Sequence, residues 1–153
     1  MARTDEASLL IPASAVRVYR ALVTADAVPH WLPPEGMTAR VEQFEPKAGG
    51  AYRVVLTHAD ATGDPGKTTA DSDVVEGRFI EVVPGVRVVQ EVGFATDDSA
   101  LAGTMTMTWE LSAEGMSTRA LVRAENVPDG IRADDHVAAL ETSLAQLAEY
   151  VRR

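Results

Sequence analysis

The sequence has 153 residues, of which 46% are hydrophobic, and its formal net charge is −9. A surface this negative repels phosphate backbones, so we expect no nucleic-acid partner. The absence of cysteine excludes disulfides, thiolate catalysis and cysteine-based metal sites. No run of about 18 apolar residues occurs, so membrane insertion is not expected either.

The length suits one domain spanning residues 1–153. Residues 1–14 lack a basic region followed by a long apolar core, so they do not resemble a secretory signal. We therefore expect a cytoplasmic protein, either a monomer or a homodimer.

The chain opens with a segment typical of a strand followed by a helix. Residues 4–11 become increasingly apolar and predict a strand, which Pro12 ends. Ser14 can cap a helix over residues 15–24, where apolar side chains recur at helical spacing.

The next stretch, VPHWLPPEGM at residues 28–37, combines one of the two tryptophans with three of the eight prolines. Asp26 can cap a short helix that runs to about Trp31. Pro33 and Pro34 prevent that helix from continuing. A bulky apolar side chain is thus held in a segment that cannot be regular.

Six segments with strand character follow, separated by turns rich in glycine, proline and aspartate. Gly77, inside one of them, predicts a bulge or a bend. The polar residues 58–71 predict a loop or a long hairpin tip. The expected strands are 37–44, 51–56, 72–83, 86–94, 103–111 and 116–127.

Residues 131–151 break the strand pattern, because apolar side chains recur there at steps of three and four. This spacing predicts a long amphipathic C-terminal helix. Consecutive hairpin strands make an antiparallel sheet, and the helix must cover its apolar face. The fold class is therefore α+β, with a curved sheet of six to seven strands and two short helices after the first strand.

A straight helix across a curved sheet leaves space at one end, and the inward side chains decide whether that space is filled. The inward side chains of the last strand, such as Ala120 and Val122, are small. Met105, Met107 and Trp109 share a face of the strand before it. Small residues beside flexible methionines suit a cavity with an adaptable wall. The alternative is that large and small side chains interlock and fill the core.

The order of these elements resembles the START-like (SRPBCC) superfamily. The motifs that carry the likeness are VYRALVTADAVPHWLPPEGM, EPKAGGAYRV and DDHVAALETSLAQLAEYV. The most similar branch is that of the C-terminal domain of the activator of Hsp90 ATPase. The resemblance covers nearly the whole chain. It implies a helix-grip fold, in which an antiparallel sheet wraps round a long helix with an apolar cavity between them. It does not imply one function, because this fold hosts lipid binders, cyclases, hormone receptors and co-chaperone modules.

The first functional hypothesis is a small-molecule binding protein that holds an apolar or amphipathic ligand between the last helix and the sheet. Trp31 would close one end of the cavity, and ordinary core packing at the sheet edge is its alternative role. Phe79 should point inward if Gly77 marks a bulge. The residues expected to form the wall are Trp31, Tyr52, Phe79, Met105, Met107, Trp109, Ala120, Val122, Leu140 and Leu144.

The second hypothesis is a polyketide cyclase- or dehydratase-like enzyme that uses no metal, nucleotide or other cofactor. The sequence contains no zinc-binding histidine spacing, nucleophile elbow or P-loop. A histidine or carboxylate in an apolar cavity can move protons, and the candidates are His30, Glu35 and His136. Tyr52 and Arg78 are further polar groups that could reach the cavity.

Each of these residues also has a structural interpretation. His30 and Glu35 would lie on the rim, and Arg78 would be solvated. Tyr52 would be a core aromatic whose hydroxyl is satisfied. His136 would cap the last helix or pair locally at its start. A third hypothesis, a protein-interaction module, predicts a filled core and an exposed apolar patch.

Overall fold

The computed structural model describes residues 3–34, 36–58, 72–95 and 99–152, and its elements follow the predicted order. The predicted 58–71 loop lies, apart from its first residue, outside the described residues. The elements are β1 (Arg3–Ile11), α1 (Ala15–Leu22), α2 (Val28–Trp31), β2 (Met37–Phe44), β3 (Ala51–His58), β4 (Ser72–Val83), β5 (Arg87–Phe94), β6 (Met105–Glu114), β7 (Ser117–Val127) and α3 (Ala133–Arg152).

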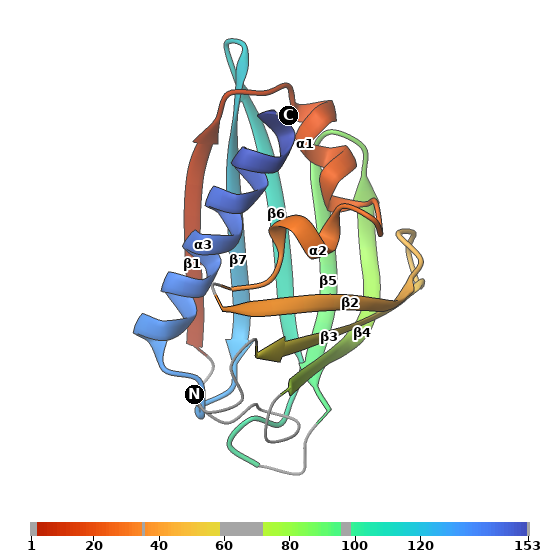
Figure 1. The fold of residues 1–153 in the computed structure, drawn as a ribbon, viewed down its shortest axis with the longest axis vertical. Coiled ribbons are helices and arrows are strands. Elements are labelled where there is room, and N and C mark those ends of the chain that lie inside the picture. Colours follow the sequence, from red (N-terminus) through yellow and green to blue (C-terminus); the bar gives the residue numbers. More distant parts are fainter. Residues whose placement is uncertain (1–2, 35, 59–71, 96–98, 153) are drawn as a thin grey trace.

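The seven strands form one antiparallel sheet in the order β1-β7-β6-β5-β4-β3-β2. The first strand therefore pairs with the last one, and β1 and β2 lie at opposite edges. Figure 1 shows β2 running across the direction of β5, β6 and β7, so the sheet is strongly curved. This sheet, with its C-terminal helix, has the predicted α+β helix-grip architecture.

Gly77 permits the close approach of β4 to β5. A Cβ atom at this position would lie 1.7 Å from the carbonyl oxygen of Glu91, so only glycine fits. The pairing register is unbroken at Gly77, and the β-bulge occurs at Ile80, between Phe79 and Glu81. Gly77 is thus a point of close strand contact, and the bulge predicted as one alternative there lies three residues later.

Replacing Gly77 with alanine should lower the free energy of unfolding by about 2 kcal/mol or more, because the two strand backbones must move apart. Urea unfolding measures this change. The matched control is Arg78→Ala, one residue along, which removes an exposed ion pair with Glu91 and should cost less than about 1 kcal/mol. A Gly77→Ala variant as stable as the wild type would contradict the close approach.

Helix α3 packs most closely against β1, α1 and α2. In Figure 1 it runs obliquely in front of β1 and β7. Because the helix rests on one edge of the sheet and on the two short helices, the middle strands are not in close contact with it. This arrangement leaves room under the helix for a pocket. Within the described parts of the chain, none of the helices is long and apolar enough to span a membrane.

Candidate functional site

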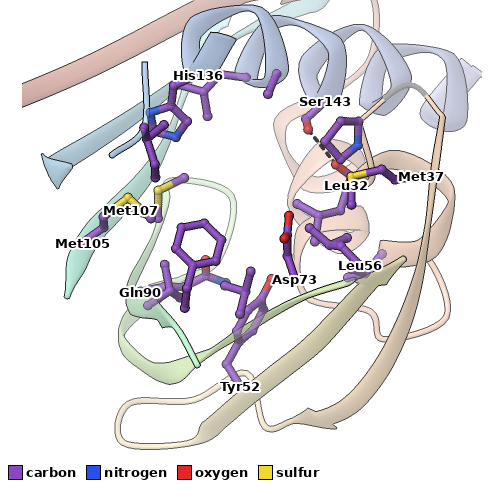
Figure 2. A pocket seen from close by; sticks show the side chains of 18 of the residues that line it. Leu32, Met37, Tyr52, Leu56, Asp73, Gln90, Met105, Met107, His136 and Ser143 are labelled. Carbon is purple, nitrogen blue, oxygen red and sulfur yellow. Dashed lines mark hydrogen bonds between the residues drawn. The ribbon is translucent and has the colours of Figure 1, made fainter. Parts of the chain in front are cut away.

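A pocket with a volume of about 370 Å³ lies between α3 and the sheet. Figure 2 shows side chains of the sheet and of α3 on opposite sides of it. Apolar side chains make up most of the lining. The polar side chains among the lining residues are Tyr52, Asp73, Gln90, Trp109, Trp31, Arg132, Asp135, His136 and Ser143.

The structure divides the ten predicted wall residues into two groups. Those that line the pocket are Trp31, Tyr52, Met105, Met107, Trp109 and Leu140. The others are buried in the core away from it, namely Phe79, Ala120, Val122 and Leu144.

Local packing explains why these four side chains are separated from the pocket. Phe79 lies edge-on to Phe44 and Tyr52, with ring centroids 5.3 and 5.8 Å away, and those two rings face the pocket in its place. The inward residues of β7 pair with β1, the edge strand on which α3 packs, and both are buried in the core. Leu144 belongs to the buried face of the same helix.

Trp31 serves as both core and pocket wall. Its side chain is buried, and its Nε1–H donates a hydrogen bond to the carbonyl oxygen of Ala21 at 2.9 Å. The indole ring packs edge-on against Trp109, with a centroid separation of 5.2 Å. Both residues line the pocket, so Trp31 is at once a core residue and part of the pocket wall.

Two side chains of α3 hold the proline-rich segment in place. Ser143 Oγ donates to the carbonyl of Leu32 at 2.8 Å. Gln146 Nε2 donates to the carbonyls of Trp31 and Pro33 at 2.9 and 2.6 Å. Carbonyls at a helix end lack intrahelical partners, and here α3 supplies them. The segment that the prolines exclude from regular structure is therefore hydrogen-bonded to α3, the helix on one side of the pocket.

The sheet side of the pocket contains two polar groups with unused hydrogen-bonding capacity. The Tyr52 hydroxyl and the Gln90 carboxamide have no hydrogen-bond partner among the described residues, although each residue is more than nine-tenths buried. Burial raises the pKa of Tyr52, so its hydroxyl stays neutral and can both donate and accept. The ring of Tyr52 is a buried core aromatic, as predicted, and its residue lines the pocket. The buried Asp73 carboxyl group lies nearby on the same wall (Figure 2).

His136 lines the opposite part of the pocket, in the first turns of α3. Its Nδ1 lies 2.7 Å from Oδ2 of Asp5 on β1, 131 positions away in the sequence. The expectation of local pairing at the helix start was therefore wrong. The packing of α3 on β1 brings a buried carboxylate closer to the ring than the neighbouring aspartates of the helix itself.

Asp5 also accepts hydrogen bonds from a cation on its own strand, Arg3. Nε and Nη2 of Arg3 donate to the Asp5 carboxylate at 3.1 and 3.0 Å. Burial alone would raise the pKa of Asp5, but the hydrogen bonds from Arg3 and His136 outweigh it, and the net pKa is lowered. Asp5 is therefore an anion at neutral pH.

The lowered pKa of Asp5 has a consequence for acid stability. A carboxyl group whose pKa is lower in the folded state contributes stability above its unfolded value, here 3.8. That contribution is lost as the pH falls from this value through the folded pKa. Urea unfolding at pH 7 and at about pH 3 should show a smaller acid-induced loss in Asp5→Asn than in the wild type, since asparagine does not titrate. Equal losses in the two proteins would contradict this assignment.

The remaining candidates lie elsewhere. His30 is exposed, stacks on Tyr150 with a centroid separation of 5.5 Å and does not line the pocket. Arg78 is exposed and pairs with Glu91, as predicted for a solvated residue. Glu35 lies outside the described residues. No cluster of three or more histidine, aspartate or glutamate side chains in the described part of the chain could hold a metal ion.

Sequence reasoning missed Asp5 and Gln90, although the alternation pattern of their strands could have identified both residues. Asp5 occupies an inward position of β1, in alternation with Ala7, Leu9 and Ile11. Gln90 occupies the inward position between Val88 and Val92 on β5. A polar side chain at a position that alternation assigns to the core marks a partner or a cavity.

Solved structures similar to this one support the architecture. Protein CV1439 from Chromobacterium violaceum is 30% identical, with a TM-score of 0.86 over 98% of this chain and 97% of that chain. A protein from Rhodobacter sphaeroides is 18% identical, with a TM-score of 0.77 over 99% and 98% of the two chains. DynU16, from the dynemicin biosynthetic locus, is 17% identical, with a TM-score of 0.67 over 97% of this chain and 47% of that chain.

A family model links the sequence itself to a named group of proteins. The model described as "Activator of Hsp90 ATPase homolog 1-like protein" matches residues 12–152. No curated protein matched the chain. The matched range includes α1, α2, six of the strands and α3, and it agrees with the branch that the sequence motifs resemble. The chain therefore belongs to the family of activator of Hsp90 ATPase homolog 1-like proteins, within the START-like fold.

Proposed function

We propose that this protein binds an apolar or amphipathic small molecule in the pocket between α3 and the sheet. The observation that carries the proposal is a volume of about 370 Å³ walled mainly by apolar side chains. Sites for small ligands typically range from about 300 to 1,000 Å³, so this pocket suits a compact molecule. Burial of the ligand's apolar surface would supply most of the affinity.

The polar groups of the sheet would set the ligand's orientation. Tyr52 and Gln90 have polar atoms that lack described partners and that an occupant could satisfy. An unsatisfied buried polar group costs roughly 1–3 kcal/mol, so a ligand with a complementary carbonyl or hydroxyl gains specificity. We therefore favour an amphipathic ligand over a pure hydrocarbon.

The fold class is compatible with this proposal and with others. START-like proteins include lipid binders and cyclases as well as co-chaperone modules, so the family alone does not choose among them. An open pocket favours ligand binding over an interaction module with a filled core. Membership of this family does not imply that the chain activates the Hsp90 ATPase.

The test combines a neutral dye with native mass spectrometry. N-phenyl-1-naphthylamine is apolar and uncharged, so the net charge of −9 does not repel it. We expect saturable binding with one dye per chain. Protein purified gently from its own cells should also carry a bound mass of a few hundred daltons that disappears on denaturation, as expected for a compact ligand. Absence of both dye binding and a bound mass would contradict the proposal.

A further inference from the structure

The contact between Asp5 and His136 places a hydrogen-bonded carboxylate–imidazole pair at the margin of an apolar pocket. The two residues come from β1 and α3, elements that pack closely together. The side chain of His136 is 13% exposed and that of Asp5 is 5% exposed. A pair this well shielded from water is held in one geometry, which a surface pair is not.

The charge of Asp5 fixes which nitrogen of His136 bears the proton. Asp5 is an anion that also accepts hydrogen bonds from Arg3. The 2.7 Å contact with Nδ1 then requires Nδ1 to carry hydrogen and to donate it. In the neutral ring, Nε2 consequently has a free lone pair, and in the charged ring it carries an acidic proton.

Nε2 of His136 is also accessible. It has no hydrogen-bond partner among the described residues. Every fully buried polar side-chain atom in that part of the chain has a partner, so Nε2 cannot be fully buried. The residue itself lines the pocket. A bound molecule can therefore reach this nitrogen.

The neighbouring groups favour proton transfer over covalent catalysis. The hydroxyl of Ser143, on the same helix, is engaged with the carbonyl of Leu32. The Tyr52 hydroxyl and the Gln90 amide across the pocket can donate hydrogen bonds to an oxygen that gains negative charge. The pocket thus combines an oriented base with neutral donors on the opposite wall (Figure 2).

We propose that His136, positioned by Asp5, acts as a general acid–base on an apolar carbonyl compound bound in this pocket. Nε2 removes a proton from the carbon next to the carbonyl, the C–H electron pair forms a new carbon–carbon double bond, and the π electron pair of the carbonyl moves onto its oxygen. Tyr52 or Gln90 donates a hydrogen bond to the resulting enolate oxygen. The imidazolium then returns the proton to a conjugated carbon of an unsaturated carbonyl compound, so the double bond shifts and no co-reactant is needed. This inference rests on the proposed function, because the pocket must admit a ligand.

A probe that needs only a base tests the proposal without knowledge of the natural substrate. 5-Nitrobenzisoxazole is a neutral aromatic molecule. Removal of its C3 proton breaks the N–O bond, forms a nitrile and leaves the electron pair on a coloured phenolate. A positioned base contributes about 10²–10⁴-fold to such a step. We expect the protein to accelerate ring opening over buffer, and His136→Gln to lose at least about tenfold of that rate.

The matched control is His30→Gln, the same change at an exposed histidine outside the pocket, which should leave the rate unchanged. Asp5→Asn tests the positioning role. It removes the charge that holds Nδ1–H of the ring, so kcat for ring opening should fall while the KM for 5-nitrobenzisoxazole stays close to the wild-type value. The other charged groups near the ring are Arg3 on β1, Arg132 and Asp135 at the start of α3, and Asp73 across the pocket.

The outcomes separate this proposal from the one on which it rests. Displacement of N-phenyl-1-naphthylamine by 5-nitrobenzisoxazole measures binding independently of catalysis. Binding without a His136-dependent rate would overturn the acid–base role and leave the binding function intact. A failure of both molecules to bind, together with the absence of a bound mass in the native protein, would overturn both proposals. If His136→Gln folds poorly, the pH–rate profile of the wild-type protein tests the acid–base role instead. A rate that does not change with pH would overturn that role, because it is incompatible with a titrating base.

Discussion

Replacing Trp31 with alanine should lower the free energy of unfolding by about 3–5 kcal/mol, as for other large-to-small core changes. The side chain is 4% exposed, so its apolar surface is almost wholly removed from water. The substitution also leaves the carbonyl of Ala21 without its donor and removes the edge-on contact with Trp109. Guanidinium unfolding followed by circular dichroism measures the change, since fluorescence would lose one of the two tryptophans.

Trp31→Phe separates the packing of this residue from its hydrogen bond. Phenylalanine keeps most of the apolar surface but cannot donate to Ala21, so we expect a loss of about 1–3 kcal/mol. The α3 side chains that hold the segment bind its backbone carbonyls and are unaffected by either change. A loss below about 1 kcal/mol for Trp31→Ala would show that this end of the pocket is not part of the packed core.

Met107→Trp is expected to abolish or strongly weaken binding of N-phenyl-1-naphthylamine. Met107 lines the pocket, and a larger, stiffer side chain there occupies space that the dye requires. We expect at least a tenfold increase in Kd, which corresponds to about 1.4 kcal/mol. The stability should change much less than in Trp31→Ala, because the indole enters open volume and displaces no packed side chain. Titration of the dye by fluorescence measures the effect.

Met116→Trp is the matched control for this experiment. Met116 is 94% exposed between β6 and β7, so the same substitution adds the same side chain far from any buried surface. Binding and stability should both stay close to those of the wild type. Equal dye affinity in Met107→Trp and Met116→Trp would mean that the dye binds somewhere other than this pocket.

The candidate site was only partly predictable. The alternation of Met105, Met107 and Trp109 identified a wall that faces the pocket. The same logic selected Ala120 and Val122, which are buried in the core but do not line the pocket. Alternation assigns a side chain to a face of the sheet, and it carries no information about what lies above that face.

Local pattern alone predicted the secondary structure. Alternating apolar residues and turn residues predicted the strands, and apolar residues at steps of three and four predicted α3. These periods reflect the geometry of each element by itself. The pairing of β1 with β7, the contact of His136 with Asp5 and the anchoring of the 31–33 carbonyls by α3 required the tertiary structure. Each of these joins residues more than a hundred positions apart. Such contacts follow from how a curved sheet and a helix pack together, and no short-range periodicity encodes that packing.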